Sequence, residues 1–168
     1  MITIGFIGTG LMGLPMAKNI LKSGFKLKAF NRSIEKAEPL KEFGAEISKT
    51  ISDVVKDSDF VITMLTDDSA VDAITSSSDF LDNLKSGSTV IDMSSVKPTT
   101  ATKHGTNLKS KNVNYLDAPV SGGTIGAEEA SLAIMVGGDQ SVFDNSEKIL
   151  KAMGNPTLVG PIGSGQVS

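Results

Sequence analysis

The sequence contains no cysteine, no tryptophan and a single histidine, His104. The lack of cysteine excludes a disulfide framework and a thiolate metal site, and one imidazole cannot form a zinc site alone, so we expect no bound metal. Lys103 and Gly105 flank His104, and no carboxylate stands close to it in the sequence. We therefore interpret His104 as a solvated helix residue.

The chain also lacks a charge excess and long hydrophobic runs. Its formal net charge is -3, which provides no basic surface for a nucleic-acid partner. No stretch approaches the roughly 18 consecutive apolar residues that span a bilayer, and a strand pattern begins at once without a signal peptide. We therefore expect a cytoplasmic protein with no membrane partner. Its 168 residues, of which 39% are hydrophobic, suffice for one domain with its own core.

The first 33 residues carry the strongest signal in the chain. An apolar strand pattern at residues 2–7 leads into Gly8-Thr9-Gly10-Leu11-Met12-Gly13, then into a helix pattern that ends at Ser23-Gly24, and then into a second strand at residues 25–30. A GxGxxG motif in this strand, turn, helix and strand context is the dinucleotide-binding fingerprint, whereas a glycine-rich turn without a ligand needs no such flanks. We predict that Gly8 permits the turn, Gly10 lets a pyrophosphate approach and Gly13 lets the helix pack on the strand. The phosphates would lie on the N–H groups of the helix that begins near Leu11 and Met12.

The residues after the second strand indicate which dinucleotide binds. NAD enzymes usually place a carboxylate there for the ribose hydroxyls, whereas this chain has Asn31-Arg32-Ser33. A guanidinium can hold a 2′-phosphate through charge-assisted hydrogen bonds, and the neighbouring amide and hydroxyl add neutral partners. We therefore predict NADP as the cofactor, with NAD also possible. The alternative interpretation is that Arg32 is a solvated loop residue or stacks on adenine without selecting the phosphate.

The rest of the chain alternates strand and helix patterns, which predicts an α/β fold with a Rossmann-type, doubly wound, mostly parallel sheet in a single domain. A continuous apolar run at residues 60–65 is typical of a buried central strand. Further strands are expected at residues 45–47, 89–93, 113–116, 132–136 and 157–159. Helices are expected at residues 33–43, after Thr50 or Ser52, after residues 66–68, at residues 98–111 and from Asp139 to Gly154, and residues 119–126 are expected to form an irregular loop.

Ligands of open α/β sheets bind outside the carboxyl ends of the strands, so the segments that follow strands are candidate sites. Leu65 and Thr66 follow one strand, and Ser95 and Val96 follow the next, where both pairs could contact the ribose and nicotinamide. Ser121-Gly122-Gly123 follows a third strand and offers a hydroxyl and unhindered N–H groups, a nest suited to a small carboxylate. An ordinary glycine-rich turn explains that spacing equally well.

Four segments together resemble the β-hydroxyacid dehydrogenase family: residues 5–19, 92–95, 117–123 and 134–138. The resemblance covers the chain in order and is greatest to the 3-hydroxyisobutyrate dehydrogenase type. Tartronate semialdehyde and glyoxylate/succinic semialdehyde reductases are alternatives. Two positions depart from the family pattern, with Thr9 where the family usually has Leu and Ala130 where it usually has Gly.

The resemblance implies hydride transfer, without a metal, between NADP(H) and a small 3-hydroxy acid or its semialdehyde. It assigns Met12, Asn31, Arg32, Leu65 and Ser95 to the cofactor, and Ser121, Gly122 and Gly123 to the substrate carboxylate. Ser121 is thus the candidate catalytic side chain on this chain.

The family's catalytic lysine lies in a Gly-x-Gly-x-x-x-Lys pattern, which begins here at Gly163 and reaches Ser168, so the lysine is expected just beyond Ser168. Residues 1–168 would then be the NAD(P)-binding domain without the interdomain helix and the C-terminal helical domain through which the family forms homo-oligomers. Alone it is expected to be inactive. The alternative is a stand-alone, non-catalytic dinucleotide-binding module whose partner supplies the rest.

Overall fold

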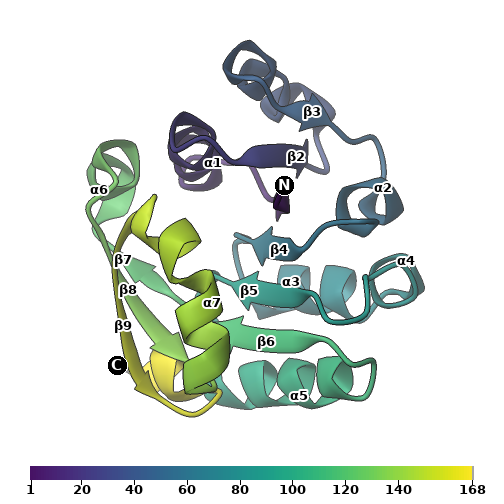
Figure 1. The fold of residues 1–168 in the computed structure, drawn as a ribbon, viewed down its shortest axis with the longest axis vertical. Helices are drawn as coiled ribbons and strands as arrows, with labels where there is room; N and C mark the ends of the chain where they lie inside the picture. Colours follow the sequence, from purple (N-terminus) through teal and green to yellow (C-terminus); the bar gives the residue numbers. More distant parts are fainter. Residues whose placement is uncertain (168) are drawn as a thin grey trace.

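The fold is a nine-stranded sheet between two layers of helices, and the computed structural model describes residues 1–167 of it (Figure 1). The sheet order is β3-β2-β1-β4-β5-β6-β8-β7, with β9 paired to β8. The strands are β1 (Thr3–Ile7), β2 (Lys26–Phe30), β3 (Glu46–Ile47), β4 (Phe60–Thr63), β5 (Thr89–Asp92), β6 (Asn114–Asp117), β7 (Val120–Ser121), β8 (Leu132–Gly137) and β9 (Gly154–Gly160). The first six are mutually parallel in the order 3-2-1-4-5-6, which confirms the predicted Rossmann-type sheet.

Alternate strand residues face two separate hydrophobic clusters. Ile4 and Phe6 of β1 face the cluster formed with α1 (Gly13–Lys22), the short 3-10 helix η2 (Glu38–Phe43), α6 (Gly123–Glu129) and α7 (Gln140–Lys151). A second short 3-10 helix, η1 (Ile34–Lys36), precedes η2 and has no buried residue. Ile7 faces the cluster formed with α2 (Ile51–Val55), α3 (Asp68–Thr75), α4 (Ser78–Leu81) and α5 (Pro98–Lys109). Every residue of β4 and β5 is buried, because helices cover both faces of these central strands.

The expected helix at residues 33–43 forms instead as the two 3-10 segments η1 and η2. Pro39 lies inside this stretch and has no backbone N–H, so it cannot continue an α-helical hydrogen-bond ladder. Gly44 ends the segment in the left-handed conformation, at φ 96°, as the sequence predicts.

The expected loop at residues 119–126 is wrong, because it contains β7 and the start of α6. Three glycines in this stretch favoured a turn, yet Gly126 lies within the helix, where a Cβ would come 3.1 Å from a methyl of Leu132. The glycine therefore serves close packing of α6 on β8 rather than chain reversal. Gly154 likewise begins β9 instead of ending α7.

None of the helices within residues 1–167 has the length and apolar content needed to cross a membrane. The same residues contain no cluster of three histidine, aspartate or glutamate side chains arranged to hold a metal ion.

Candidate cofactor site

The carboxyl ends of the parallel strands line up at one edge of the sheet. Ile7 pairs with Phe30 on one side and Thr63 on the other, and the alignment continues through Asp92 to Asp117. The segments that follow β1, β2, β4, β5 and β6 therefore all leave the sheet at this edge. All of the predicted cofactor residues lie in the first four of these segments, and the order of the strands reverses between β1 and β4, where dinucleotides bind in this fold.

The glycine turn after β1 is a close-packed piece of backbone. Gly8 has φ 105°, its N–H donates to the carbonyl of Phe30 at 3.0 Å, and a Cβ there would overlap the carbonyl oxygen of Met64. A Cβ at Gly13 would overlap the carbonyl oxygen of Gly8. Both glycines are therefore required by the turn itself, in agreement with the structural tasks predicted for them.

Gly10 differs from the other two glycines of the motif. No heavy atom lies within 4 Å of the position that its Cβ would take, and the residue is exposed. The following helix α1 has no side-chain cap at Met12 and no acidic residue in its first turn. The open space over Gly10 and the uncapped N–H groups of α1 leave room and donors for a pyrophosphate, whose binding here stays a prediction.

A cavity of about 690 Å³ opens beside the glycine turn. Thr9, Gly10 and Leu11 line one part of it, and Lys36 of η1 and Thr124 of α6 line others. Lys36 adds a cation that the sequence analysis did not assign, although its position four residues after Arg32 in a short helical segment could have suggested it.

Asn31 holds the glycine turn to the segment after β2. Its Oδ1 accepts a hydrogen bond from the N–H of Thr9 at 2.9 Å, and its Nδ2 donates to the carbonyl of Ser33 at 3.0 Å. Arg32, between them in sequence, is exposed and makes no ion pair with any residue in 1–167. Asn31 thus organises the two segments, while the guanidinium of Arg32 remains available to a ligand.

A buried polar network joins the segments after β4 and β5. The N–H of Leu65 donates to Oγ of Ser94 at 2.8 Å, and the N–H of Ser94 donates to Oδ1 of Asp92 at 3.0 Å. Thr63 donates its hydroxyl to the same oxygen of Asp92 at 2.9 Å. The network fixes the positions of Leu65 and Ser94, and thereby the backbone that leads into the exposed residues Thr66 and Ser95.

Asp92 is fully buried, and its Oδ2 has no hydrogen-bond partner among the described residues. Burial raises the pKa of Asp92 to about 6, against the opposing effect of the hydrogen bonds from Ser94 and Thr63. No short sequence pattern reveals the hydrogen bonds among Thr63, Asp92 and Ser94, because the bonded residues come from two different strands.

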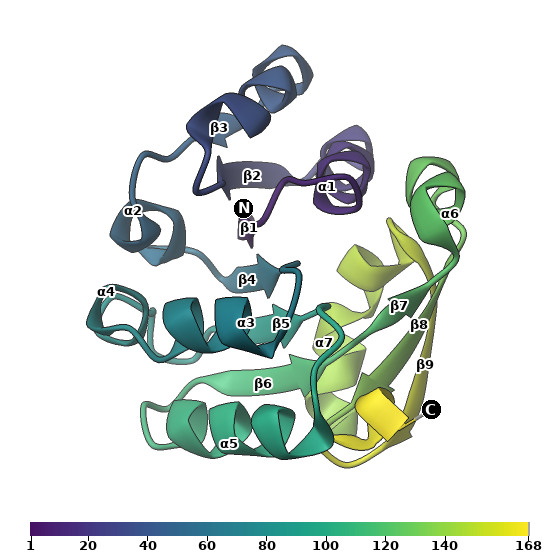
Figure 2. The same cartoon turned by 180° about the vertical axis from the view of Figure 1, so that it is seen from behind.

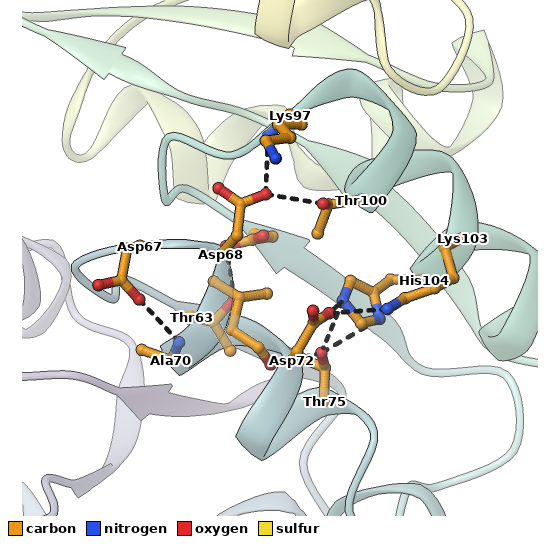
Figure 3. Close-up of polar contacts among 12 residues, drawn as sticks. Thr63, Asp67, Asp68, Ala70, Asp72, Thr75, Lys97, Thr100, Lys103 and His104 are labelled. Atoms are coloured by element: carbon orange, nitrogen blue, oxygen red, sulfur yellow. Dashed lines mark hydrogen bonds and ion pairs between the residues drawn. The ribbon is translucent and has the colours of Figure 1, made fainter.

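The helices behind these segments are also tied together (Figure 3). Asp67 caps α3 by accepting the N–H of Ala70 at 2.9 Å. The next residue, Asp68, accepts the N–H of Lys97 at 3.0 Å and the hydroxyl of Thr100 at 2.7 Å. The start of α3 is thereby held against the start of α5, which supports the segments after β4 and β5 from outside the sheet.

The expectation that His104 is solvated is wrong. Its side chain is only 1% exposed, and Nε2 lies 2.7 Å from Oδ1 of Asp72 on the neighbouring helix, with the Thr75 hydroxyl 3.2 Å from the ring (Figure 3). Burial lowers the pKa of His104, and the Asp72 carboxylate opposes that shift. The carboxylate partner is 32 positions away in sequence, so inspection of the flanking residues could not find it.

The predicted substrate residues Ser121, Gly122 and Gly123 are exposed at the end of β7. This strand continues the direction of β6 beyond the edge of the sheet and pairs with β8, so that it rises toward α1 and α6 (Figure 2). Nδ2 of Asn19 on α1 donates to the carbonyl of Ala127 on α6 at 2.7 Å. The segment after β6 therefore lies on the same side of the sheet as the glycine turn.

Residues 3–163 of this sequence match the sequence model of a protein family, the NAD binding domain of 6-phosphogluconate dehydrogenase. The chain belongs to this family of NAD-binding domains. The match includes the glycine turn and the segments after all of the first six strands.

Individual relatives are oxidoreductases. The NAD-dependent L-serine dehydrogenase of Pseudomonas aeruginosa is 38% identical over 167 residues, which cover 98% of this chain and 56% of that protein. The mitochondrial 3-hydroxyisobutyrate dehydrogenase of Drosophila melanogaster is 38% identical over 168 residues, which cover 98% of this chain and 51% of that protein. The structure of Mycobacterium tuberculosis 3-hydroxyisobutyrate dehydrogenase with L-serine matches with a TM-score of 0.95 at 33% identity, over 99% of this chain and 57% of that one.

These matches confirm the resemblance to the β-hydroxyacid dehydrogenases, and the chain spans little more than half the length of the relatives named here.

The two residues that depart from the family pattern, Thr9 and Ala130, are each unusual in the structure. Thr9 is buried, and its hydroxyl has no hydrogen-bond partner among the described residues. Ala130 has φ 55°, a left-handed conformation that glycine adopts more readily.

Proposed function

We propose that this chain is the NADP(H)-binding domain of an oxidoreductase that acts on a small 3-hydroxy acid or its semialdehyde. One observation carries the choice of cofactor: the segment after β2 presents the unpaired guanidinium of Arg32 and contains no carboxylate from Asn31 to Ser33. A carboxylate at this place would repel a 2′-phosphate, whereas a guanidinium attracts it. When bound, the dinucleotide accepts hydride from the hydroxy acid or donates it to the semialdehyde.

Different groups of residues would bind different parts of the dinucleotide. The N–H groups at the start of α1, from Leu11 to Gly13, would hold the pyrophosphate over Gly10. Arg32 and Ser33 would bind the 2′-phosphate, with Lys36 of the adjacent cavity as an additional cation. Leu65, Thr66, Ser95 and Val96 would face the ribose and the nicotinamide.

Ser121, Gly122 and Gly123 would hold the substrate carboxylate through a hydroxyl and backbone N–H groups. Fixing the carboxylate also orients the neighbouring hydroxyl carbon, which converts binding energy into alignment. The proton would be transferred by a lysine beyond Ser168, in a longer polypeptide with a helical domain that also forms the homo-oligomer. The greater length of the relatives supports this arrangement. Residues 1–168 alone would bind the cofactor without turnover.

A charge reversal at Arg32 tests the cofactor choice. Arg32→Asp should weaken NADP binding by about 1.5–3 kcal/mol, the scale of a lost charge-assisted contact. It should not weaken NAD binding, because a carboxylate at this position can accept hydrogen bonds from the ribose hydroxyls. Calorimetric titration of both dinucleotides measures the effect. Lys56→Asp is the matched control, because Lys56 is exposed just before β4, at the opposite edge of the sheet. Equal affinities of the unmodified chain for NADP and NAD would contradict the proposal.

The substrate end is tested by Ser121→Ala in a polypeptide extended beyond Ser168. Loss of the hydroxyl should lower kcat/KM for the hydroxy acid and leave the dissociation constant of NADP nearly unchanged. The substrate panel should include L-serine, itself a 3-hydroxy acid, because one relative is named for it and a solved relative was determined with it. If the substitution weakens NADP binding as much as it slows turnover, Ser121 belongs to the cofactor site instead.

A further inference from the structure

The segment 163–167 wraps around a single buried carboxylate at the end of β6. Oδ1 of Asp117 accepts the N–H of Gly163 at 2.7 Å, and Oδ2 accepts the N–H of Gln166 at 3.2 Å. A Cβ at Gly165 would lie 2.8 Å from Oδ2 of the same residue, so only glycine permits this approach. Asp117 is fully buried and thus anchors the turn η3 (Ser164–Val167) to the edge of the sheet.

The anchored turn places the Gln166 side chain against the segment after β5. Its Oε1 accepts the N–H of Val96 at 3.0 Å, and its Nε2 donates to the carbonyl of Ser94 at 3.0 Å. The two hydrogen bonds span Ser95, in the way that a neighbouring strand would pair with an extended segment. Ser94 is also held from the other side by Asp92 and Leu65, so the backbone around Ser95 is fixed in two directions.

We propose that Gln166 is a positioning residue, which holds the segment Ser94–Val96 in place for the nicotinamide half of the dinucleotide, and that Asp117 anchors the turn that presents it. The proposal rests on the proposed function, since it takes this segment as the nicotinamide contact. The glycine-rich stretch after β9 would then have a structural role of its own, besides preceding the expected lysine. That stretch connects the cofactor segment after β5 with the start of the substrate segment after β6.

The side chain must be an amide, because the contact requires one donor and one acceptor. In Gln166→Glu the carboxylate can still accept the N–H of Val96, but it cannot donate to the carbonyl of Ser94 and repels that oxygen. Gln166→Met has a similar length and makes neither hydrogen bond. Gln140→Glu is the matched control, since Gln140 is the only other glutamine and is exposed on α7.

The experiment compares two ligands of the 168-residue chain, NADPH and 2′,5′-ADP, which has the adenine half and the 2′-phosphate but no nicotinamide. Gln166→Glu and Gln166→Met should each raise the dissociation constant of NADPH about tenfold and change that of 2′,5′-ADP less than about twofold. Hydrogen exchange of the Val96 amide should become faster in Gln166→Met. Gln140→Glu should behave as the unmodified chain in all three measurements.

Each outcome has a definite meaning. If NADPH binding is unchanged in both Gln166 variants, or if NADPH and 2′,5′-ADP weaken equally, Gln166 does not position the nicotinamide segment and the proposed function stands. If the unmodified chain binds neither ligand, the proposed function is wrong and the role of Gln166 falls with it, whatever the exchange rate at Val96.

Discussion

The glycine turn after β1 and the turn after β9 lie at the same edge of the sheet, but they are held there in different ways. The first is fixed by backbone packing and by the side chain of Asn31, all within about 25 residues of sequence except for the contact with Met64. The second is fixed by side chains that bind backbone groups 46 to 72 positions away. A local sequence pattern can therefore reveal the first turn, whereas the second depends on which strands become neighbours.

The largest expected effect is a difference in stability between alanine variants at two glycines of the first turn. Gly13→Ala should lower the free energy of unfolding by at least about 3 kcal/mol, because its Cβ would overlap the carbonyl oxygen of Gly8 in closely packed backbone. Gly10→Ala should change stability by less than about 0.5 kcal/mol, because its Cβ enters open space, and yet it should weaken NADP binding. Urea unfolding and calorimetric titration of both variants measure these effects. A loss of stability in Gly10→Ala similar to that in Gly13→Ala would show that Gly10, like Gly13, is required for the packing of the turn.

The second effect concerns the buried network between the two turns. With its pKa raised from 3.8 to about 6, Asp92 binds a proton more tightly in the folded state than in the unfolded state. Its contribution to stability is therefore greatest below about pH 4 and decreases as the pH rises to about 6, by on the order of 3 kcal/mol.

Asp92→Asn should remove this pH dependence while keeping an acceptor for Thr63 and Ser94. The stability difference between variant and parent should shift in the variant's favour between pH 4 and pH 7, measured by urea unfolding at each pH. Asp79→Asn, at an exposed position of α4, serves as the control. A constant difference across the range would show that Asp92 remains ionised in the folded protein.

The smallest expected effect lies outside both turns, at Ala130, the residue that ends α6. Ala130→Gly should raise the free energy of unfolding by about 1 kcal/mol, because φ 55° is costly for a residue with a Cβ. Ala152→Gly, at a right-handed position after α7, should instead destabilise the protein by a similar amount. If both substitutions destabilise the protein, the left-handed conformation of Ala130 does not cost it stability.

The sequence predicted most elements of the parallel sheet, because buried parallel strands are continuous apolar runs and the turns between them carry recognisable caps. The central strand predicted at residues 60–65 forms as β4 and ends at Thr63, and Thr50 caps α2 as one of two alternatives predicted. The errors fall where residues satisfy long-range contacts. Gly126 packs a helix on β8 where a loop was expected, and His104 is paired with Asp72 across two helices.

The sequence by itself determined the doubly wound fold and the glycine turn, since strand periodicity and the conformational demands of Gly8 and Gly13 are local properties. Only the tertiary structure decided which polar side chains hold the site together. Asp92 and Asp117 became buried neighbours because β5 and β6 pair in register, and Gln166 meets Ser94 and Val96 because the turn after β9 returns to the ends of those strands. Such contacts depend on the pairing of distant strands, for which no short stretch of sequence contains a signal.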